Sequence, residues 1–259
     1  AINCHRTNYI DALYIHSNAH RNRIAHNFSS YKQSGYLMHG MHSHVRTDRN
    51  PRRDMEVYYG MISLMDKYIG KILDHLDALG LTEDTLVVFT TDHGNLFGQH
   101  GLYAKGPFLY EDLLRVPLIA RCPGMIAPGT TTDSLQSLVD IAPTFLDCLG
   151  LPIPYHMTGI SEKPVWDGSV DTLRSCILAE HHHEPTTIQE RAYVDSRYKL
   201  VVYQEDGTGE LYDLEEDPQE LNNLWAQPQY ADLKNDLLLK YIRADLSRES
   251  KSMPRIANA

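Results

Sequence analysis

The sequence has little that would suit it to a membrane or to nucleic acid. No stretch approaches the roughly 18 consecutive apolar residues that a membrane-spanning helix needs, and residues 1–14 have no signal-peptide pattern. Lys and Arg number 24 against 34 Asp and Glu, for a formal net charge of −10. Phosphate backbones and anionic lipids attract basic surfaces, so we expect neither nucleic acid nor a membrane as a partner. An anionic substrate would have to be held by a few local groups.

Cysteine is also scarce. The four cysteines, at positions 4, 122, 148 and 176, show no CxxC pair and no zinc-ligand spacing. We therefore expect reduced thiols, most of them buried, and neither a disulfide framework nor a zinc site.

The composition is that of a globular α/β chain. With 259 residues and 42% hydrophobic residues, it can bury a sizeable core. Periodicity predicts helices over 54–79, 140–150 and 229–246, and strands over 86–89, 115–121, 175–180, 192–194 and 198–203. The strand at 86–89 is short and apolar, as expected of a buried parallel strand. The helix over 54–79 is amphipathic and is expected to pack through its apolar face before Gly80 ends it.

Two units are expected along the chain. Residues 1–53 are rich in His, Arg, Asn and Ser and are predicted to form loops. Proline and glycine cluster over 151–171. We place the boundary there, between a main α/β domain at 1–155 and a smaller unit, an antiparallel sheet with a helix, at 156–259.

The stretch from Thr90 to Glu111 concentrates the candidate chemistry. Asp92 and His93 follow the apolar strand, and the carboxyl ends of strands are where ligands bind in open α/β sheets. A carboxylate beside an imidazole forms half of a divalent-metal site, and Lys105 adds a cation for a bound anion. The alternative is a simple turn in which Asp92 caps a helix.

Other polar residues are weaker candidates. His42 and His44 alternate, so their side chains can point to one side of an extended segment, although a solvated loop is the alternative. Asp140 begins a predicted helix and is interpreted as a first-turn carboxylate rather than a ligand. His181-His182-His183, at the end of a predicted strand, is interpreted as an exposed strand end, with contact to a metal or substrate as the alternative.

The order of these motifs resembles the sulfatase family of the alkaline-phosphatase superfamily. The resemblance rests on Asp92-His93-Gly94, Lys105-Gly106, the Arg-Val-Pro-Leu-Ile run at 115–119, Tyr58-Tyr59, the Asp-Ile-Ala-Pro-Thr helix start at 140–144, and the Glu-Leu-Tyr-Asp-Leu segment at 210–214 with Asp217-Pro218. It extends from about Glu56 to Leu246.

The resemblance implies a partial alkaline-phosphatase-like α/β/α sandwich and cleavage of a sulfate monoester, carried on a small molecule or a carbohydrate. It implies that Asp92 and His93 bind a divalent metal, Ca²⁺ first and Mn²⁺ second. Lys105 would bind substrate and stabilise charge, His100 would be a further substrate-binding residue, and a histidine, His42 or His44, would protonate the leaving group.

One part of the family pattern has no match. Sulfatases carry two consecutive aspartates and a Cys/Ser-x-Pro-x-Arg motif whose Cys or Ser becomes the formylglycine nucleophile, and these 259 residues contain neither. We therefore expect a C-terminal portion of a sulfatase-like protein that is inactive by itself. Two alternatives stay open, namely a phosphonate monoester or phosphodiester hydrolase of the same superfamily, and a non-catalytic sulfatase-like module.

Overall fold

The protein's structure, a computed structural model, describes residues 50–106, 108–182, 189–204 and 209–248. Its helices are α3 (Pro51–Ala78), α4 (Glu111–Leu114), α5 (Ile141–Cys148), α6 (Lys163–Trp166) and α7 (Ala231–Ser247), with 3-10 turns η2 (Thr82–Asp84), η3 (Gln99–Gly101), η4 (Leu138–Asp140) and η5 (Pro228–Tyr230). Its strands are β1 (Val87–Thr90), β2 (Leu96–Phe97), β3 (Tyr103–Ala104), β4 (Leu118–Arg121), β5 (Cys176–His182), β6 (Gln189–Asp195), β7 (Tyr198–Tyr203) and β8 (Gly209–Asp213). The mixed α/β class is as predicted.

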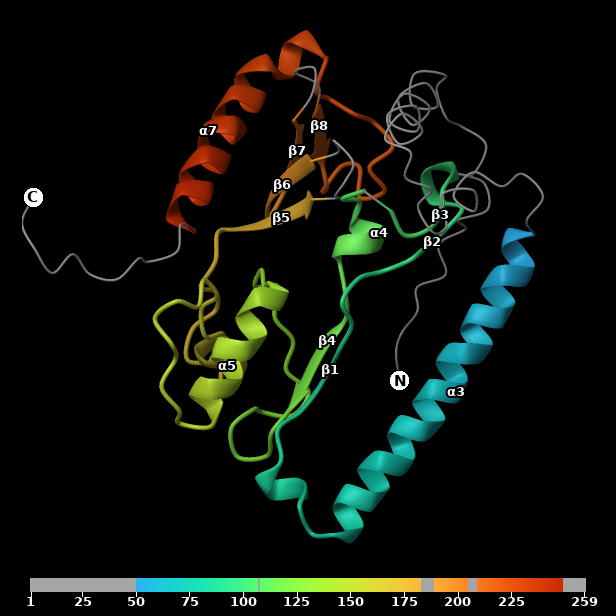
Figure 1. Cartoon of the computed structure of the whole chain (residues 1–259), viewed down its shortest axis with the longest axis vertical. Helices are drawn as coiled ribbons and strands as arrows, with labels where there is room; N and C mark the ends of the chain where they lie inside the picture. Colours follow the sequence, from blue (N-terminus) through green and yellow to red (C-terminus); the bar gives the residue numbers. More distant parts are fainter. Residues whose placement is uncertain (1–49, 107, 183–188, 205–208, 249–259) are drawn as a thin grey trace, which may run out of the picture.

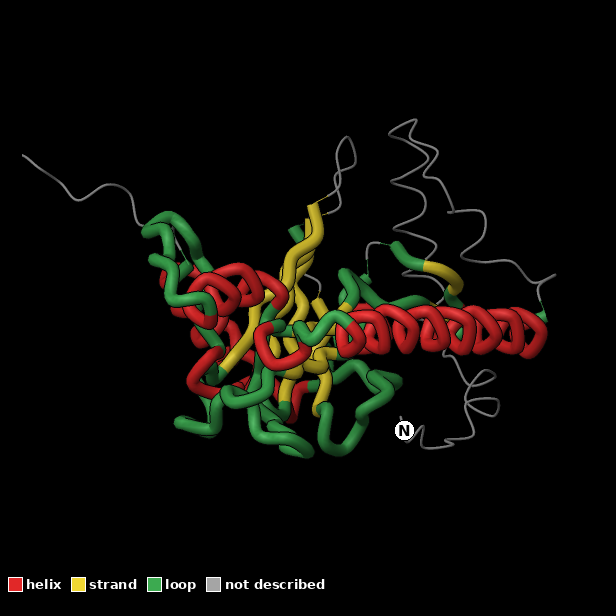
Figure 2. Tube along the Cα trace, turned by 90° about the horizontal axis from the view of Figure 1, so that it is seen from below, coloured by secondary structure: helices red, strands yellow, loops and turns green. Residues whose placement is uncertain are grey.

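Helix α3 begins and ends where the sequence places its signals. The Asn50 side chain accepts a hydrogen bond from the Arg53 amide, and Gly80 follows the helix with a φ of 69°. The helix extends to one side of the strands (Figures 1 and 2). Tyr58 contacts Phe97, with ring centroids 4.6 Å apart. The predicted packing of the apolar face is only partly seen among the described residues. Half-buried members of that face are Ile62, Ile69, Leu73 and Leu76, whereas Tyr58, Met61, Met65, Ile72 and Leu79 are exposed.

Strands β1 and β4 form an antiparallel pair in which Thr90 lies opposite Leu118. The prediction of a buried parallel strand at 86–89 is therefore wrong for the described residues, where β1 is half-buried and its partner runs the other way. A run of four apolar residues does not encode strand direction. The segment 91–117 connects β1 to β4 and carries Asp92 and Lys105. The pairing of β1 with β4 brings the two ends of this segment together.

The C-terminal unit is a four-stranded antiparallel sheet in the order β5-β6-β7-β8. Successive residues of β7 face opposite sides of the sheet. Leu200 packs with Leu237 of α7 on one side, and Val201 packs with Leu109 on the other. The sheet thus lies between α7 and the segment that leads into α4 (Figure 1). The antiparallel sheet with a helix is as predicted; β8 was not predicted as a strand.

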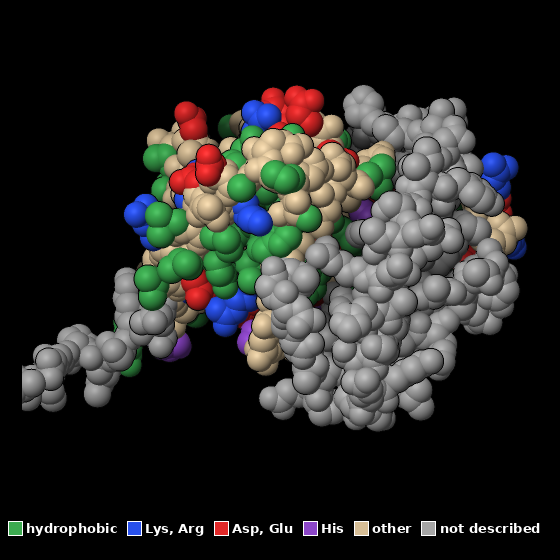
Figure 3. All heavy atoms as spheres, turned by 90° about the horizontal axis from the view of Figure 1, so that it is seen from above, with side chains coloured by type: hydrophobic (Ala, Val, Ile, Leu, Met, Phe, Trp, Pro, Cys, Tyr) green, Lys and Arg blue, Asp and Glu red, His purple; other side chains and the backbone are tan. Residues whose placement is uncertain are grey.

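The outer face of this unit is mixed in character. In Figure 3, acidic and basic side chains are interspersed among apolar ones on the face seen from above. No helix among the described residues combines the length and the apolar character required to cross a membrane. Cys122, Cys148 and Cys176 are free thiols, each half-buried rather than fully buried.

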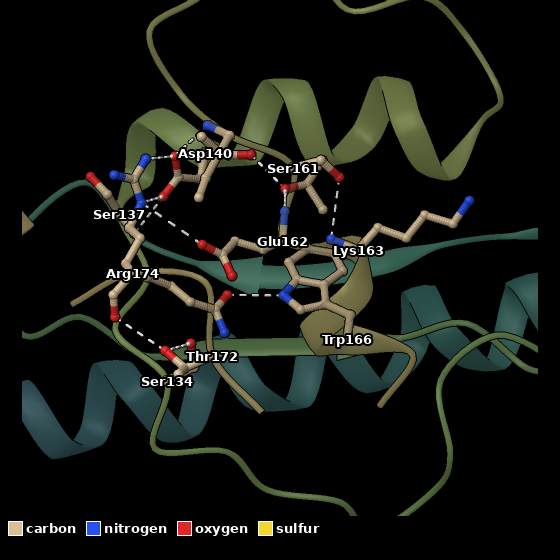
Figure 4. A network of polar contacts seen from close by, with 12 residues as sticks. Ser134, Ser137, Asp140, Ser161, Glu162, Lys163, Trp166, Thr172 and Arg174 are labelled. Carbon is tan, nitrogen blue, oxygen red and sulfur yellow. Dashed lines mark hydrogen bonds and ion pairs between the residues drawn. The ribbon is translucent and has the colours of Figure 1, made fainter. Parts of the chain in front are cut away.

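A polar network fixes the segment between α5 and β5 (Figure 4). Asp140 is buried, accepts a hydrogen bond from the Ile160 amide at 2.8 Å, and is paired with both Arg174 nitrogens that face it. It also closes a capping box with Ser137. Arg174 Nε lies 3.8 Å from Glu162 Oε1. Asp140 is thus a structural carboxylate, and the division of the chain at residue 155, still a prediction, falls inside the loop that this network ties down.

Glu162 gives the fold a pH dependence. Burial, followed by the negative charge of Asp140, raises its pKa to about 7 from the ordinary 4.5, although Arg174 opposes the shift. Between these two values the folded chain holds a proton that the unfolded chain has lost, so the free energy of unfolding falls as the pH rises from 4.5 to 7. Below 4.5 the contribution is fully present, and above 7 it is lost.

We expect Glu162→Gln to flatten this fall, because glutamine keeps the shape without titrating. Urea unfolding midpoints measured from pH 4.5 to 8 test the expectation, with the exposed Glu83→Gln as a control that should parallel the wild type. A Glu162→Gln curve as steep as the wild-type curve would contradict it.

Candidate active site

Asp92 stands immediately beyond β1 with its carboxylate exposed. The Thr91 hydroxyl donates to its Oδ1 at 3.2 Å and the His93 amide donates to the same oxygen at 3.0 Å. Partial desolvation raises the pKa of Asp92, but the electrostatic interaction with the His93 ring and these hydrogen bonds outweigh it, so the pKa lies below its usual value. The side chain is an ionised, outward-facing oxygen donor at neutral pH.

The ring of His93 is held in one tautomer. Its Nδ1 lies 2.7 Å from the carbonyl oxygen of Gly94, which can only accept, so Nδ1 carries the proton. Its Nε2 lies 2.8 Å from Lys105 Nζ and 3.5 Å from Asp92 Oδ2. Because an ammonium only donates, Nε2 presents a lone pair. A neutral imidazole with its second nitrogen fixed by a backbone carbonyl is the form that binds metals.

Lys105 reaches His93 because the chain doubles back between them. Strands β2 and β3 pair with Leu96 opposite Ala104, which returns the chain to the end of β1. Gly98 makes the turn with a φ of 116°, which glycine adopts without the steric cost of a side chain. The exposed Lys105 therefore lies beside a residue 12 positions earlier in the sequence.

Gly94 is required by space rather than by backbone conformation, since its φ is not positive. Its amide donates to the Leu113 carbonyl of α4 at 2.8 Å. A Cβ built at Gly94 would lie 1.8 Å from the Asp112 carbonyl oxygen. The Asp92–Gly94 turn rests directly on α4.

His100 is buried beneath the site rather than exposed at it. Its ring stacks on Tyr110 with centroids 3.7 Å apart, and its Nε2 lies 4.0 Å from Asp112 Oδ2. Its φ of 53° is in the left-handed region, which non-glycine residues seldom occupy. Burial raises the pKa of Asp112, with Lys199 lowering it and Glu111 raising it further. The substrate-binding role of His100 stays a prediction, and its burial favours a packing role instead.

The described residues bring together three of the predicted site residues: Asp92, His93 and Lys105. His42 and His44 lie outside the described residues. A carboxylate with a neutral imidazole fits a divalent cation, but no group of three or more potential metal ligands occurs in the described part of the chain. Two supporting residues were not predicted. Thr91 donates to Asp92, and its place next to Asp92 in the sequence was the available signal. The backbone of Asp112 lies against Gly94.

The comparisons with known proteins identify the family. The family model for sulfatases matches residues 8–151, and the model for the C-terminal part of N-sulphoglucosamine sulphohydrolase matches residues 98–246. The chain belongs to the sulfatase family. Members of this family generally use a divalent metal.

Among curated relatives, the chain is 32% identical to an N-acetylglucosamine-6-O-sulfatase of Bacteroides thetaiotaomicron, over 71% of this chain and 34% of the relative. It is 34% identical to a choline-sulfatase of Rhizobium meliloti, over 70% of this chain and 35% of the relative. The chain thus spans about a third of the length of these relatives.

Solved structures agree on the fold. A protein in complex with its substrate, D-glucosamine-2-N,6-O-disulfate, matches with a TM-score of 0.68 at 28% identity, over 76% of this chain and 41% of the other. The phosphonate monoester hydrolase of Agrobacterium radiobacter matches with a TM-score of 0.70, also at 28% identity, over 76% of this chain and 42% of the other. Both matches support the alkaline-phosphatase-like architecture.

Because Gly94 lies so close to α4, a methyl group added at this position should lower the stability of the fold. Gly94→Ala should destabilise the fold by ~1–3 kcal/mol, the scale of overpacking, because its Cβ meets backbone that cannot rotate away. Gly60→Ala, in α3 with no atom near the added Cβ, should instead stabilise by ~0.5–1 kcal/mol. Urea unfolding measures both changes. Equal effects of the two substitutions would show that the contact at Gly94 is not constraining.

Proposed function

We propose that the protein, in its complete form, hydrolyses a sulfate monoester with Asp92 and His93 as metal ligands and Lys105 as the charge-stabilising residue. The observation that carries this proposal is the contact chain from Asp92 through His93 to Lys105, which gathers an oxygen donor, an imidazole lone pair and an ammonium on one exposed edge. This set suits a tetrahedral anion bound to a cation.

Asp92 and His93 are proposed to bind the cation, and Lys105 the anionic substrate. Asp92 and His93 would hold the cation, which we propose to be Ca²⁺, with Mn²⁺ as the second choice because imidazole suits transition metals. When bound, such a cation polarises the sulfuryl oxygens and lowers the pKa of a nucleophile. The Gly94 carbonyl keeps the His93 proton on Nδ1, so Nε2 needs no deprotonation before it binds the cation.

Binding of a cation at His93 would remove the hydrogen-bond acceptor of Lys105. Its ammonium now donates to His93 Nε2, the same lone pair that a cation would use. With a cation on that nitrogen, the ammonium would lose this acceptor and would turn to the sulfuryl or ester oxygen, where negative charge develops as the S–O bond breaks. Charge stabilisation of this kind acts most strongly where negative charge develops in the transition state.

The remaining parts of the reaction are proposed from the family resemblance. His42 or His44 would protonate the leaving alcohol. The nucleophile would come from the Cys/Ser-x-Pro-x-Arg motif, which these 259 residues do not contain. We propose a sulfated sugar as substrate, supported by the name of the glucosamine-sulfatase relative and by the glucosamine disulfate bound in a similar structure.

Lys105→Ala in the complete enzyme should lower kcat by ~100-fold or more, the scale of one lost charge-stabilising donor. Lys67→Ala, an exposed lysine of α3, is the matched control and should leave kcat unchanged. Initial rates on an aryl sulfate with Ca²⁺ present measure both. Near-normal turnover by Lys105→Ala would remove this residue from the mechanism.

The second candidate is hydrolysis of a phosphonate monoester, favoured by the similarity to the Agrobacterium radiobacter enzyme. Sulfate and phosphonate esters are both tetrahedral anions, so the same clamp can serve either. A side-by-side comparison of kcat/KM on aryl sulfate and aryl phosphonate decides between them. We expect the sulfate to be preferred by at least about tenfold, a difference of ~1.4 kcal/mol in transition-state stabilisation; preference for the phosphonate would reverse the assignment.

A further inference from the structure

A buried ionic cluster lies directly behind the candidate site. Lys199 of β7 is fully buried, and its Nζ lies 2.7 Å from Glu111 Oε1 and 2.7 Å from Glu220 Oε1. The same ammonium donates to the Leu109 carbonyl oxygen at 3.0 Å. The ammonium therefore has two ion-pair partners and one hydrogen-bond acceptor, all of them outside β7.

The cluster holds the N-terminal end of α4 from two sides. Glu220 accepts from the Glu111 backbone amide through Oε2 at 2.7 Å, while its other oxygen meets Lys199. Glu220 has a φ of 57°, a conformation unusual for a residue with a side chain. Its carboxylate is thus a fixed bridge between the ammonium on β7 and the backbone where α4 begins.

The same short helix α4 also contacts the candidate metal turn. Glu111, held by the cluster, is separated by a single residue from Leu113, whose carbonyl accepts the Gly94 amide. The Asp112 carbonyl oxygen lies so close to Gly94 that a Cβ there would overlap it. A displacement of α4 would therefore move the backbone that sets the directions of Asp92 and His93.

We propose that Lys199 is a positioning residue, which fixes α4 against the C-terminal sheet and thereby holds the Asp92–Gly94 turn in place. The importance of that turn rests on the function proposed above. The ammonium suits this role because a buried charge is stable only where its acceptors surround it, so α4 has one favourable position. Removing the ammonium leaves the buried Glu220 and the partly exposed Glu111 without their shared partner, which weakens the hold on α4.

A purely stabilising role makes a different prediction. If Lys199 only contributed to the free energy of unfolding, its loss would raise amide exchange through global opening, equally in the sheet and in the turn. A positioning role loosens the bond from Gly94 to Leu113 first. Hydrogen exchange resolved to single amides distinguishes these cases and needs neither metal nor turnover.

The test compares Lys199→Met with the wild-type chain. We expect exchange of the Gly94 amide to rise by about tenfold more than exchange of the paired amides of β5 and β6, the signature of local opening. The control is Lys234→Met, which removes another lysine of the C-terminal unit that donates to a backbone carbonyl, that of Trp225. It should leave Gly94 unchanged.

An unchanged Gly94 amide, or a uniform rise over the turn and the sheet, would overturn the proposal. If Lys199→Met does not fold, Glu220→Gln serves instead, because it keeps an acceptor for the Glu111 amide while removing one of the two charges that hold Lys199. The same local rise at smaller amplitude is then expected, and its absence would overturn the proposal equally.

Measuring turnover together with exchange of the Gly94 amide distinguishes a failure of the positioning role from a failure of the proposed activity. In the complete enzyme, Lys199→Met should lower kcat on aryl sulfate and weaken Ca²⁺ binding together with the faster Gly94 exchange. Faster exchange at Gly94 in a protein whose wild type cleaves no sulfate ester would leave the positioning role standing and refute the proposed activity. A loss of turnover without a change at Gly94 would refute the positioning role alone.

Discussion

The hydrogen bond from the Gly94 amide to the Leu113 carbonyl is the constraint on which the candidate site depends. It joins the turn after β1 to α4 without an intervening side chain, and only glycine leaves room for so close an approach. Backbone held against backbone moves less than a side chain that can change rotamer. Asp92 and His93 directly precede this junction. The position of their backbone therefore depends on how α4 is packed.

The segment that carries the candidate site is joined to the C-terminal sheet by packing and ionic contacts. Leu109 packs on Val201, Tyr110 approaches Tyr212 with ring centroids 6.5 Å apart, and Lys199 reaches the start of α4. The segment between β1 and β4 is thus held in place by residues about one hundred positions later in the chain. This arrangement gives the small C-terminal unit a role in the site even though none of its residues lies among Asp92, His93 and Lys105.

Electrostatics divides the molecule into exposed and buried charges with different roles. At the exposed edge, Asp92 and Lys105 remain accessible and His93 keeps a lone pair, which leaves all three available to a ligand. In the interior, Lys199 and the Asp140–Arg174 pair are enclosed by their partners. Removing one partner of such a buried pair is costly because it leaves an uncompensated charge. Here the pairs join α4 to β7 and tie down the path between α5 and β5.

Periodicity along the chain is enough to predict the long helices α3 and α7, and Gly80 is enough to predict where α3 ends. The sequence also indicated Asp92, His93 and Lys105, since ordered motifs can be recognised without knowing where they lie. Three features become visible only in the folded chain: the antiparallel direction of β1 and β4, the burial of His100, and the approach of Lys199 to Glu111 and Glu220. The reason is physical: periodicity and turn residues reflect interactions within a few positions of the chain, whereas strand direction, burial and ion pairing depend on segments that meet only after the chain has folded.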